Sequence, residues 1–218
     1  QRESSLLCAV PTSKSQVNYI YGNIIGFIEH IIESFADLQE SKNVDLDFLP
    51  DEKELFIQFD KDKIEKIIMN LISNAFKFTP EKGYIRIFTE VVTVDGFEQL
   101  KIRVKDSGIG ISQEQKERIF ERFYQSSLPN EFITRGSGIG LSLTQDFVQL
   151  LNGSIKVESE INKGSTFTIL LPLNREIPQN SSEEITWEKE QMDAPVTNNE
   201  IEPEKTSNTK KTIMLVED

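Results

Sequence analysis

The sequence predicts an α+β fold, a two-layer α/β sandwich in which helices cover one face of a mixed β-sheet. Stretches with apolar residues three and four positions apart, typical of amphipathic helices, are separated by pairs of stretches that alternate apolar and polar residues, as half-buried strands do. Along the 218 residues the order is helix, two strands, helix, two strands, helices and two strands. A doubly wound parallel sheet would instead need strands and helices in strict alternation.

The first half of the predicted domain contains two helices and two strands. Apolar residues at helical spacing predict a helix over 23–43. Segments 44–50 (VDLDFLP) and 54–60 (ELFIQFD) alternate like strands, and the short stretch between them suits a tight turn. The second helix is expected to begin at residue 60 or 61 and to end at Phe78. Its apolar face is formed by Ile64, Ile68, Leu71 and Ala75.

The next two strands are expected to form a long hairpin. Segments 84–94 (YIRIFTEVVTV) and 100–106 (LKIRVKD) are strand-like, and Asp95-Gly96 between them is a strong hairpin signal. A capping box follows, because Ser112 has Gln115 three positions later. It predicts a short helix over 113–120.

The last elements follow a polar, irregular stretch over 121–137. A helix is predicted over 138–151, where Asn152-Gly153 ends it. Segments 154–159 (SIKVES) and 165–173 (STFTILLPL) predict a final hairpin.

Composition and charge limit how many domains and which kinds of segment the chain can contain. Its length suits one domain of about 150 residues with appendages, and no apolar run approaches the roughly 18 residues that a membrane span needs. The net charge of -12 argues against a nucleic-acid-binding surface. Half of that excess lies in 176–210, where nine acidic and three basic residues predict a flexible acidic linker. The single cysteine, Cys8, fits a reducing compartment.

A polar stripe on the helix ending at Phe78 is the first candidate site. Lys66, Asn70, Asn74 and Lys77 follow one another at spacings of four, four and three, so they share one face. A carboxamide oxygen is a hard, neutral ligand for Mg²⁺, and a lysine one turn further along can contact phosphate. Taken alone, the stripe also fits the solvated face of an ordinary amphipathic helix.

The second candidate is the end of the strand over 100–106. Asp106 is followed by Gly108 and Gly110, and glycine lets the backbone approach a flat ligand closely. The carboxylate there suits the amino group of a purine as its hydrogen-bond donor. For this motif alone, an ordinary strand-ending Asp-Ser-Gly turn is the alternative.

Three glycines before the last predicted helix form the third candidate. Gly136, Gly138 and Gly140 lead into the helix, where backbone N–H groups and the positive end of the helix dipole favour phosphate. The pattern is not a dinucleotide-binding fingerprint, since no βαβ unit surrounds it. It is not a Walker loop either, because the Gly-Lys-Ser/Thr ending is missing.

Together, four segments in this order resemble the N, G1, F and G2 boxes of the catalytic ATP-binding domain of bacterial sensor histidine kinases, which belong to the GHKL ATPase superfamily. They are NLISNAFKFT (70–79), DSGIGI (106–111), IFERFYQ (119–125) and GSGIGLSL (136–143). The resemblance covers about 24–173. It implies the Bergerat-type GHKL fold, a catalytic domain over 23–175, and ATP and Mg²⁺ as cofactors.

The resemblance also implies a role for each candidate residue. Asn74 is expected to ligate Mg²⁺, with Asn70 beside it near the phosphates and Lys77 on a phosphate. Asp106 is expected to accept from the adenine amino group. The span between Phe123 and Gly136 is expected to be a mobile ATP lid. The other implied nucleotide-binding residues are Gly108 and Gly110 at the adenine pocket, Phe120 and Phe123 packing the base of the lid, Gly136, Gly138 and Gly140, which let the lid close over the phosphates, and Leu141.

Asn70 bears on the reaction type. Hydrolytic members of the superfamily typically carry a glutamate one turn before the metal-binding asparagine, where it can activate water, whereas an amide has no useful basicity. We therefore expect transfer of the γ-phosphoryl group of Mg-ATP to a histidine, catalysed by positioning and electrostatics. A GHKL-type ATPase that couples hydrolysis to a conformational change and a non-catalytic nucleotide-binding docking module stay open as alternatives.

The phosphoacceptor is expected outside this chain. His30 is the only histidine, and the residues after it do not follow the acceptor pattern of the family, so it is interpreted as an ordinary helix residue. Residues 1–22 are expected to be a linker from the missing dimerisation domain. Residues 211–218 (KTIMLVED) resemble the first strand of a receiver domain, with Glu217 and Asp218 as its acidic pair, which implies a hybrid kinase.

The expected partners are these dimerisation and receiver domains of the same parent chain. We expect no nucleic-acid binding and no direct membrane contact by this fragment, which is predicted to be monomeric and to have little activity alone. The family resemblance places it on the cytoplasmic side of a parent anchored in the bacterial inner membrane.

Overall fold

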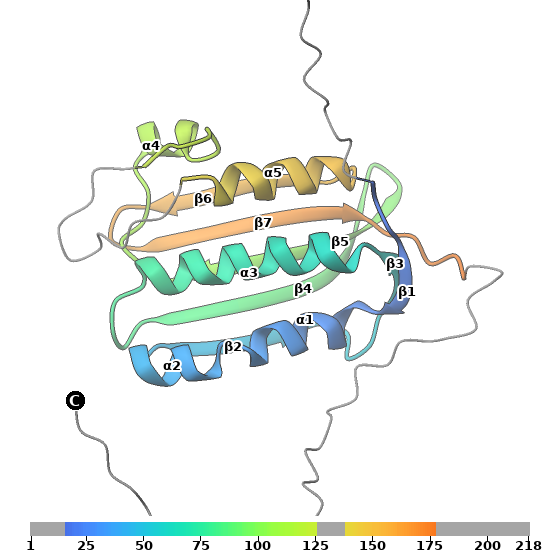
Figure 1. Cartoon of the computed structure of the whole chain (residues 1–218), viewed down its shortest axis with the longest axis horizontal. Coiled ribbons are helices and arrows are strands. Elements are labelled where there is room, and N and C mark those ends of the chain that lie inside the picture. The colour runs from blue at the N-terminus through green and yellow to red at the C-terminus, as the bar shows by residue number, and fades with distance from the viewer. Residues whose placement is uncertain (1–15, 126–137, 178–218) are drawn as a thin grey trace, which may run out of the picture. The chain divides into compact units, whose positions relative to one another are not determined.

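A five-stranded mixed sheet carries helices on one face in the computed structural model, which describes residues 16–125 and 138–177 (Figure 1). Only the pair β2–β4 is parallel, and the other neighbours are antiparallel. The predicted two-layer α+β sandwich is confirmed. In spatial order the strands are β2 (Asp45–Pro50), β4 (Tyr84–Val94), β5 (Phe97–Asp106), β7 (Gly164–Pro172) and β6 (Ser154–Glu160).

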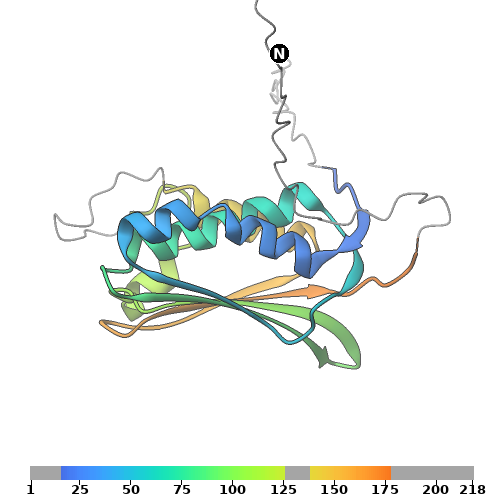
Figure 2. The same cartoon turned by 90° about the horizontal axis from the view of Figure 1, so that it is seen from below.

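The second layer is formed mainly by three helices. They are α1 (Ile24–Glu33), α3 (Lys61–Phe78) and α5 (Gly140–Leu150), and Figure 2 shows them all on the same side of the sheet. Helix α3 lies between the other two and contacts both. The short helix α4 (Gln113–Arg118) starts at the predicted capping box and ends two residues before its predicted end.

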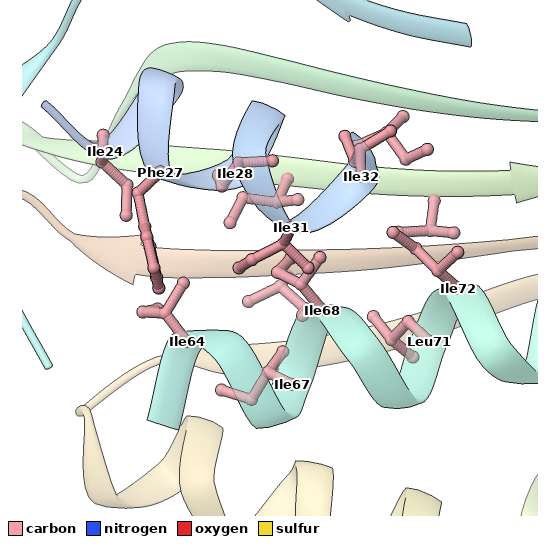
Figure 3. Close-up of a cluster of buried hydrophobic side chains, with 14 of the residues drawn as sticks. Ile24, Phe27, Ile28, Ile31, Ile32, Ile64, Ile67, Ile68, Leu71 and Ile72 are labelled. Atoms are coloured by element: carbon pink, nitrogen blue, oxygen red, sulfur yellow. The ribbon is translucent and has the colours of Figure 1, made fainter. Parts of the chain in front are cut away.

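The core lies between the helices and the sheet. Side chains of α1 and α3 point toward one another in Figure 3, where Ile28 and Ile68 have no exposed surface. Burying one such side chain contributes about 1.5–3 kcal/mol. The apolar face predicted for α3 is buried throughout, so its polar stripe is left for the opposite side.

Helix α3 begins at a buried ion pair. Asp60 caps the helix by accepting from the Lys63 N–H at 3.0 Å, and its other oxygen lies 2.6 Å from the Lys63 ammonium. The preceding chain is fixed here too, because Asn18 N donates to Asp60 at 2.8 Å and Lys63 donates to the Gln16 carbonyl at 2.8 Å. The start of α3 therefore anchors the segment that enters the fold.

A small second sheet pairs β1 (Ile20–Asn23) with β3 (Phe56–Phe59), antiparallel. On the other side of β3, Gln58 donates from its backbone to Asn174 O at 2.8 Å and from its side chain to Glu176 O at 2.7 Å. The fold thus begins before the domain boundary predicted at 23. The segments entering and leaving the fold lie on either side of β3.

The helix predicted over 23–43 is two helices, α1 and α2 (Ala36–Lys42). The chain bends at Ser34, whose hydroxyl donates to the Ile31 carbonyl at 2.6 Å. The bend directs Phe35 into the core, where its ring stacks on Phe76 at 5.8 Å between centroids. This aromatic contact explains why the apolar spacing continues across the break.

The strands predicted over 44–50 and 54–60 do not pair with each other. Instead β2 pairs with β4 in the large sheet and β3 pairs with β1 in the small one. The two later hairpins match their predictions. Asp95 and Gly96 both have positive φ, at 53° and 83°, as a tight two-residue hairpin turn requires.

Part of the predicted organisation lies outside the described residues. This holds for 1–15, for the acidic linker from 178 onward and for the receiver-like segment 211–218. Among the helices of the described part, none is both long and apolar enough to cross a membrane.

Candidate functional site

Three predicted motifs meet at one end of the helical layer. The last turns of α3, the end of β5 and the start of α5 lie at the same end of the fold (Figure 1). The Lys66 ammonium of α3 lies 5.8 Å from the Phe147 ring of α5. One turn later on α3, Asn70 donates to Thr144, which lies one turn earlier on α5, so the two helices run antiparallel. The following turn of α3, with Asn74, therefore lies toward the start of α5.

Asp106 is held rigidly at the end of β5. Its side chain is buried, and Oδ1 accepts from Gly108 N at 2.8 Å and from Ser165 N at 3.1 Å. Burial raises the pKa of this carboxyl above its usual value, although the two N–H donors act in the opposite direction. Among the described residues Oδ2 has no hydrogen-bond partner, so one carboxylate oxygen is available to a ligand donor.

The raised pKa of Asp106 predicts how stability depends on pH. Its folded-state pKa lies above the unfolded value of 3.8, so its stabilising contribution is complete below pH 3.8 and is lost as pH rises through the folded-state pKa. Asp106→Asn cannot titrate. The free energy of unfolding of the wild type, minus that of the variant, should therefore fall as pH rises from 3.8 through the folded-state pKa. Denaturant titrations at successive pH values measure this difference. A difference that rises with pH would contradict the assignment.

Two glycines after Asp106 fix its loop against neighbouring backbone. A Cβ on Gly108 would lie 2.5 Å from Phe78 O, and Ile109 N donates to the same carbonyl at 3.2 Å. Gly110 has φ 71°, and its Cβ would collide with Glu160 O. The loop therefore joins the end of α3 to the β6–β7 hairpin, as close backbone approach requires.

Gly110→Ala is expected to destabilise the domain more than Gly96→Ala does. Both glycines have positive φ, but a Cβ on Gly96 meets nothing within 4 Å. Backbone strain alone should cost the Gly96 variant about 1 kcal/mol. The added collision should bring the Gly110 variant to about 2–4 kcal/mol. Equilibrium denaturation checks this, and equal losses would show that the loop relaxes away from the hairpin.

Asn74 and Lys77 are the two residues of the site on the last turns of α3. Both are half-buried, and Asn74 makes no hydrogen bond within the described residues. The Lys77 ammonium lies 5.2 Å from the Phe78 ring centroid and pairs with no described carboxylate. The described residues contain no cluster of three His, Cys, Asp or Glu side chains suited to a metal. A neutral amide oxygen beside a cation fits Mg²⁺ that arrives with a phosphate ligand.

Asn70 is placed differently from Asn74. Its Nδ2 donates to Thr144 Oγ1 at 2.7 Å, and Gly140 lies so close that a Cβ there would collide with Asn70 Oδ1. The amide is thus held between α3 and α5. This contact brings together two of the predicted motifs.

The two phenylalanines of the F box differ in burial. Phe120 is partly buried and packs against the core, as does Leu141 of the G2 box. Phe123 instead has φ 65° and is 71% exposed. The loop whose base it is predicted to pack lies mostly outside the described residues. The positive φ serves a backbone contact, because Phe123 N donates to Gly138 O at 2.9 Å.

The glycines of the G2 box are only partly described. Gly138 has φ 69°, and a Cβ there would lie 2.9 Å from the Phe123 carbonyl carbon. Gly136 and most of the predicted lid lie outside the described residues. His30 is exposed on α1, and α3 separates α1 from α5 (Figure 1).

The sequence analysis missed two residues that hold the site. Ser165 donates its backbone N–H to Asp106 from β7, and Thr144 accepts from Asn70 on α5. Ser165 follows from the β5–β7 register, in which Lys105 faces Thr166. No local sequence signal marks either residue, because each acts across a contact between distant segments.

Comparison with known proteins agrees with this geometry. Residues 59–175 match the family described as Histidine kinase-, DNA gyrase B-, and HSP90-like ATPase. Histidine kinase P4 of Formosa agariphila is 35% identical over 210 residues, which cover 90% of this chain and 15% of that protein. Sensor histidine kinase WalK of Bacillus subtilis is 35% identical over 161 residues, 74% of this chain and 26% of WalK.

A solved structure shows the same fold. The catalytic domain of histidine kinase ThkA is 27% identical with a TM-score of 0.61, over 72% of this chain and 98% of that domain. The chain thus matches nearly a whole catalytic domain, although it spans only about a quarter or less of P4 and WalK. The chain belongs to the histidine kinase, gyrase B and HSP90-like ATPase family and contains the catalytic ATP-binding domain of a sensor histidine kinase.

Proposed function

We propose that this domain binds Mg-ATP and transfers the γ-phosphoryl group to a histidine on a dimerisation domain of the same parent protein. The observation that supports it best is the meeting of three groups at one end of the fold. These are one Asp106 oxygen and the Asn74 amide, neither with a hydrogen-bond partner among the described residues, and the start of α5. They complement an amino group, a metal and a phosphate, respectively.

Each group has a separate task in this proposal. The Asp106 carboxylate accepts from the adenine amino group, while Gly108 and Gly110 let the loop after Asp106 pack against the end of α3 and the β6–β7 hairpin beside the ring. Asn74 holds Mg²⁺, which offsets charge on the phosphates when bound. Lys77 and the first N–H groups of α5 orient the phosphate chain so that the γ-phosphorus faces an incoming imidazole.

Transfer is favoured over hydrolysis by the state of Asn70. A hydrolytic enzyme needs a base to activate water, and the position one turn before Asn74 holds an amide bonded to Thr144. An imidazole nitrogen attacks with its own lone pair, so the domain needs to supply position and charge only. The nitrogen–phosphorus bond forms as the bond from the γ-phosphorus to the β,γ-bridging oxygen breaks, and that oxygen leaves with ADP.

The setting in the parent belongs to the same proposal. Residues 1–22 would connect to the dimerisation domain, and 211–218 would begin a receiver after the acidic linker. The domain would lie on the cytoplasmic side of a parent anchored in the bacterial inner membrane. The KTIMLVED segment supports the receiver, and thereby the hybrid arrangement.

Calorimetric titration with ATP, with and without Mg²⁺, tests the proposal first. Binding that strengthens with Mg²⁺ is expected, followed by acid-labile phosphate on the parent's dimerisation domain when the two are mixed. Phosphate release without an acceptor would favour the ATPase alternative. ATP binding without transfer would favour the docking module, and a folded domain that binds no ATP would refute the assignment.

A further inference from the structure

The contact between α3 and α5 includes one hydrogen bond to a buried hydroxyl. Thr144 is 1% exposed, and its Oγ1 accepts from Asn70 Nδ2 at 2.7 Å. A threonine inside a helix often bonds a carbonyl of its own preceding turn. The partner of Thr144 is on the neighbouring helix, so its hydroxyl connects the two helices.

A second contact, one turn earlier on α5, involves the same amide. Gly140 lies against Asn70 Oδ1, where a Cβ would collide. Asn70 is therefore held by the first two turns of α5 at once. Asn74 follows Asn70 by one turn on the same face of α3, so the Asn70 contacts set its spacing from the start of α5.

We propose that Thr144 is a positioning residue for Mg-ATP, whose hydroxyl acts through Asn70 to hold the α3 stripe and the start of α5 at the spacing that the phosphates require. This inference rests on the proposed function. Asp106 is fixed by separate contacts to Gly108 and Ser165. The adenine end of the site therefore does not depend on Thr144.

The test compares Thr144→Val with Thr144→Ser, measuring calorimetric affinity for Mg-ATP and for adenosine. Valine keeps the shape and removes the hydroxyl, which leaves the half-buried Asn70 amide without its partner. We expect Mg-ATP binding to weaken about tenfold and adenosine binding to stay unchanged. Serine should restore Mg-ATP binding. In an Asn70→Ala background, Thr144→Val should add no further loss, because the shared contact is already absent.

Thr89→Val is the matched control. Thr89 is also 1% exposed, lies on β4, and has a hydroxyl with no hydrogen-bond partner. It should alter neither affinity. Thr144→Val affinities equal to those of Thr89→Val would overturn the inference, as would a parallel loss of Mg-ATP and adenosine binding. A wild type that binds adenosine but gains nothing from the phosphates and Mg²⁺ would instead overturn the proposed function, and the inference with it.

Discussion

Asp106→Asn should weaken ATP binding by about 100-fold while leaving the domain folded. Hydrogen bonds to charged groups contribute about 1.5–3 kcal/mol. The variant also turns an acceptor into a donor. If the amide oxygen keeps the two N–H contacts from Gly108 and Ser165, its NH₂ group takes the place of Oδ2 and opposes the adenine amino group.

Asp47→Asn is the control for this substitution. Asp47 is an exposed carboxylate on β2 that pairs with Arg86 at 3.3 Å, and such surface pairs contribute little. Calorimetry should show wild-type ATP affinity for this variant, and thermal unfolding should show both variants folded. Unchanged ATP affinity in Asp106→Asn would place the adenine elsewhere.

Asn74→Ala should remove the effect of Mg²⁺ on ATP binding and lower phosphotransfer by about 10²–10³. Removing one group that stabilises charge in a transition state typically costs this much in rate. The fold should tolerate the change, because Asn74 makes no hydrogen bond among the described residues and alanine favours helices.

Ser73→Ala controls for the Asn74 variant. Ser73 is exposed on the same turn of α3. The assays are calorimetry at several Mg²⁺ concentrations and transfer to the parent's dimerisation domain. Asn74→Ala that keeps its Mg²⁺ dependence would show that the metal has other ligands, and a similar loss in Ser73→Ala would indicate general damage to the helix.

The positions of helices and strands could be predicted from the sequence better than the pairing of the strands. Helix α3 is confirmed from its cap at Asp60 to Phe78 because capping and apolar period are local properties of the chain. Pairing is not local. Alternation in 44–50 and 54–60 predicts strands, but β2 pairs with β4 and β3 with β1 because of where α1 and α3 direct the chain.

The candidate site shows the same division. Asp106, Asn74 and the glycines follow from motif order, and the structure brings their segments to one end of the fold. What the sequence could not show is which of these side chains already have contacts within the fold. The Asn70 amide contacts α5, the Asn74 amide has no hydrogen-bond partner within 16–125 and 138–177, and the Phe123 ring is exposed.

The small sheet around β3 has a mechanical consequence. The chain enters along β1 and leaves past Asn174 and Glu176, so a pull between these two segments loads the hydrogen bonds on both sides of β3. Strand β3 leads into α3 through Asp60. If β1 or the 174–176 segment displaces β3, the start of α3 moves with it. Helix α3 has 18 residues and is about 27 Å long, and its far end carries Asn74 and Lys77.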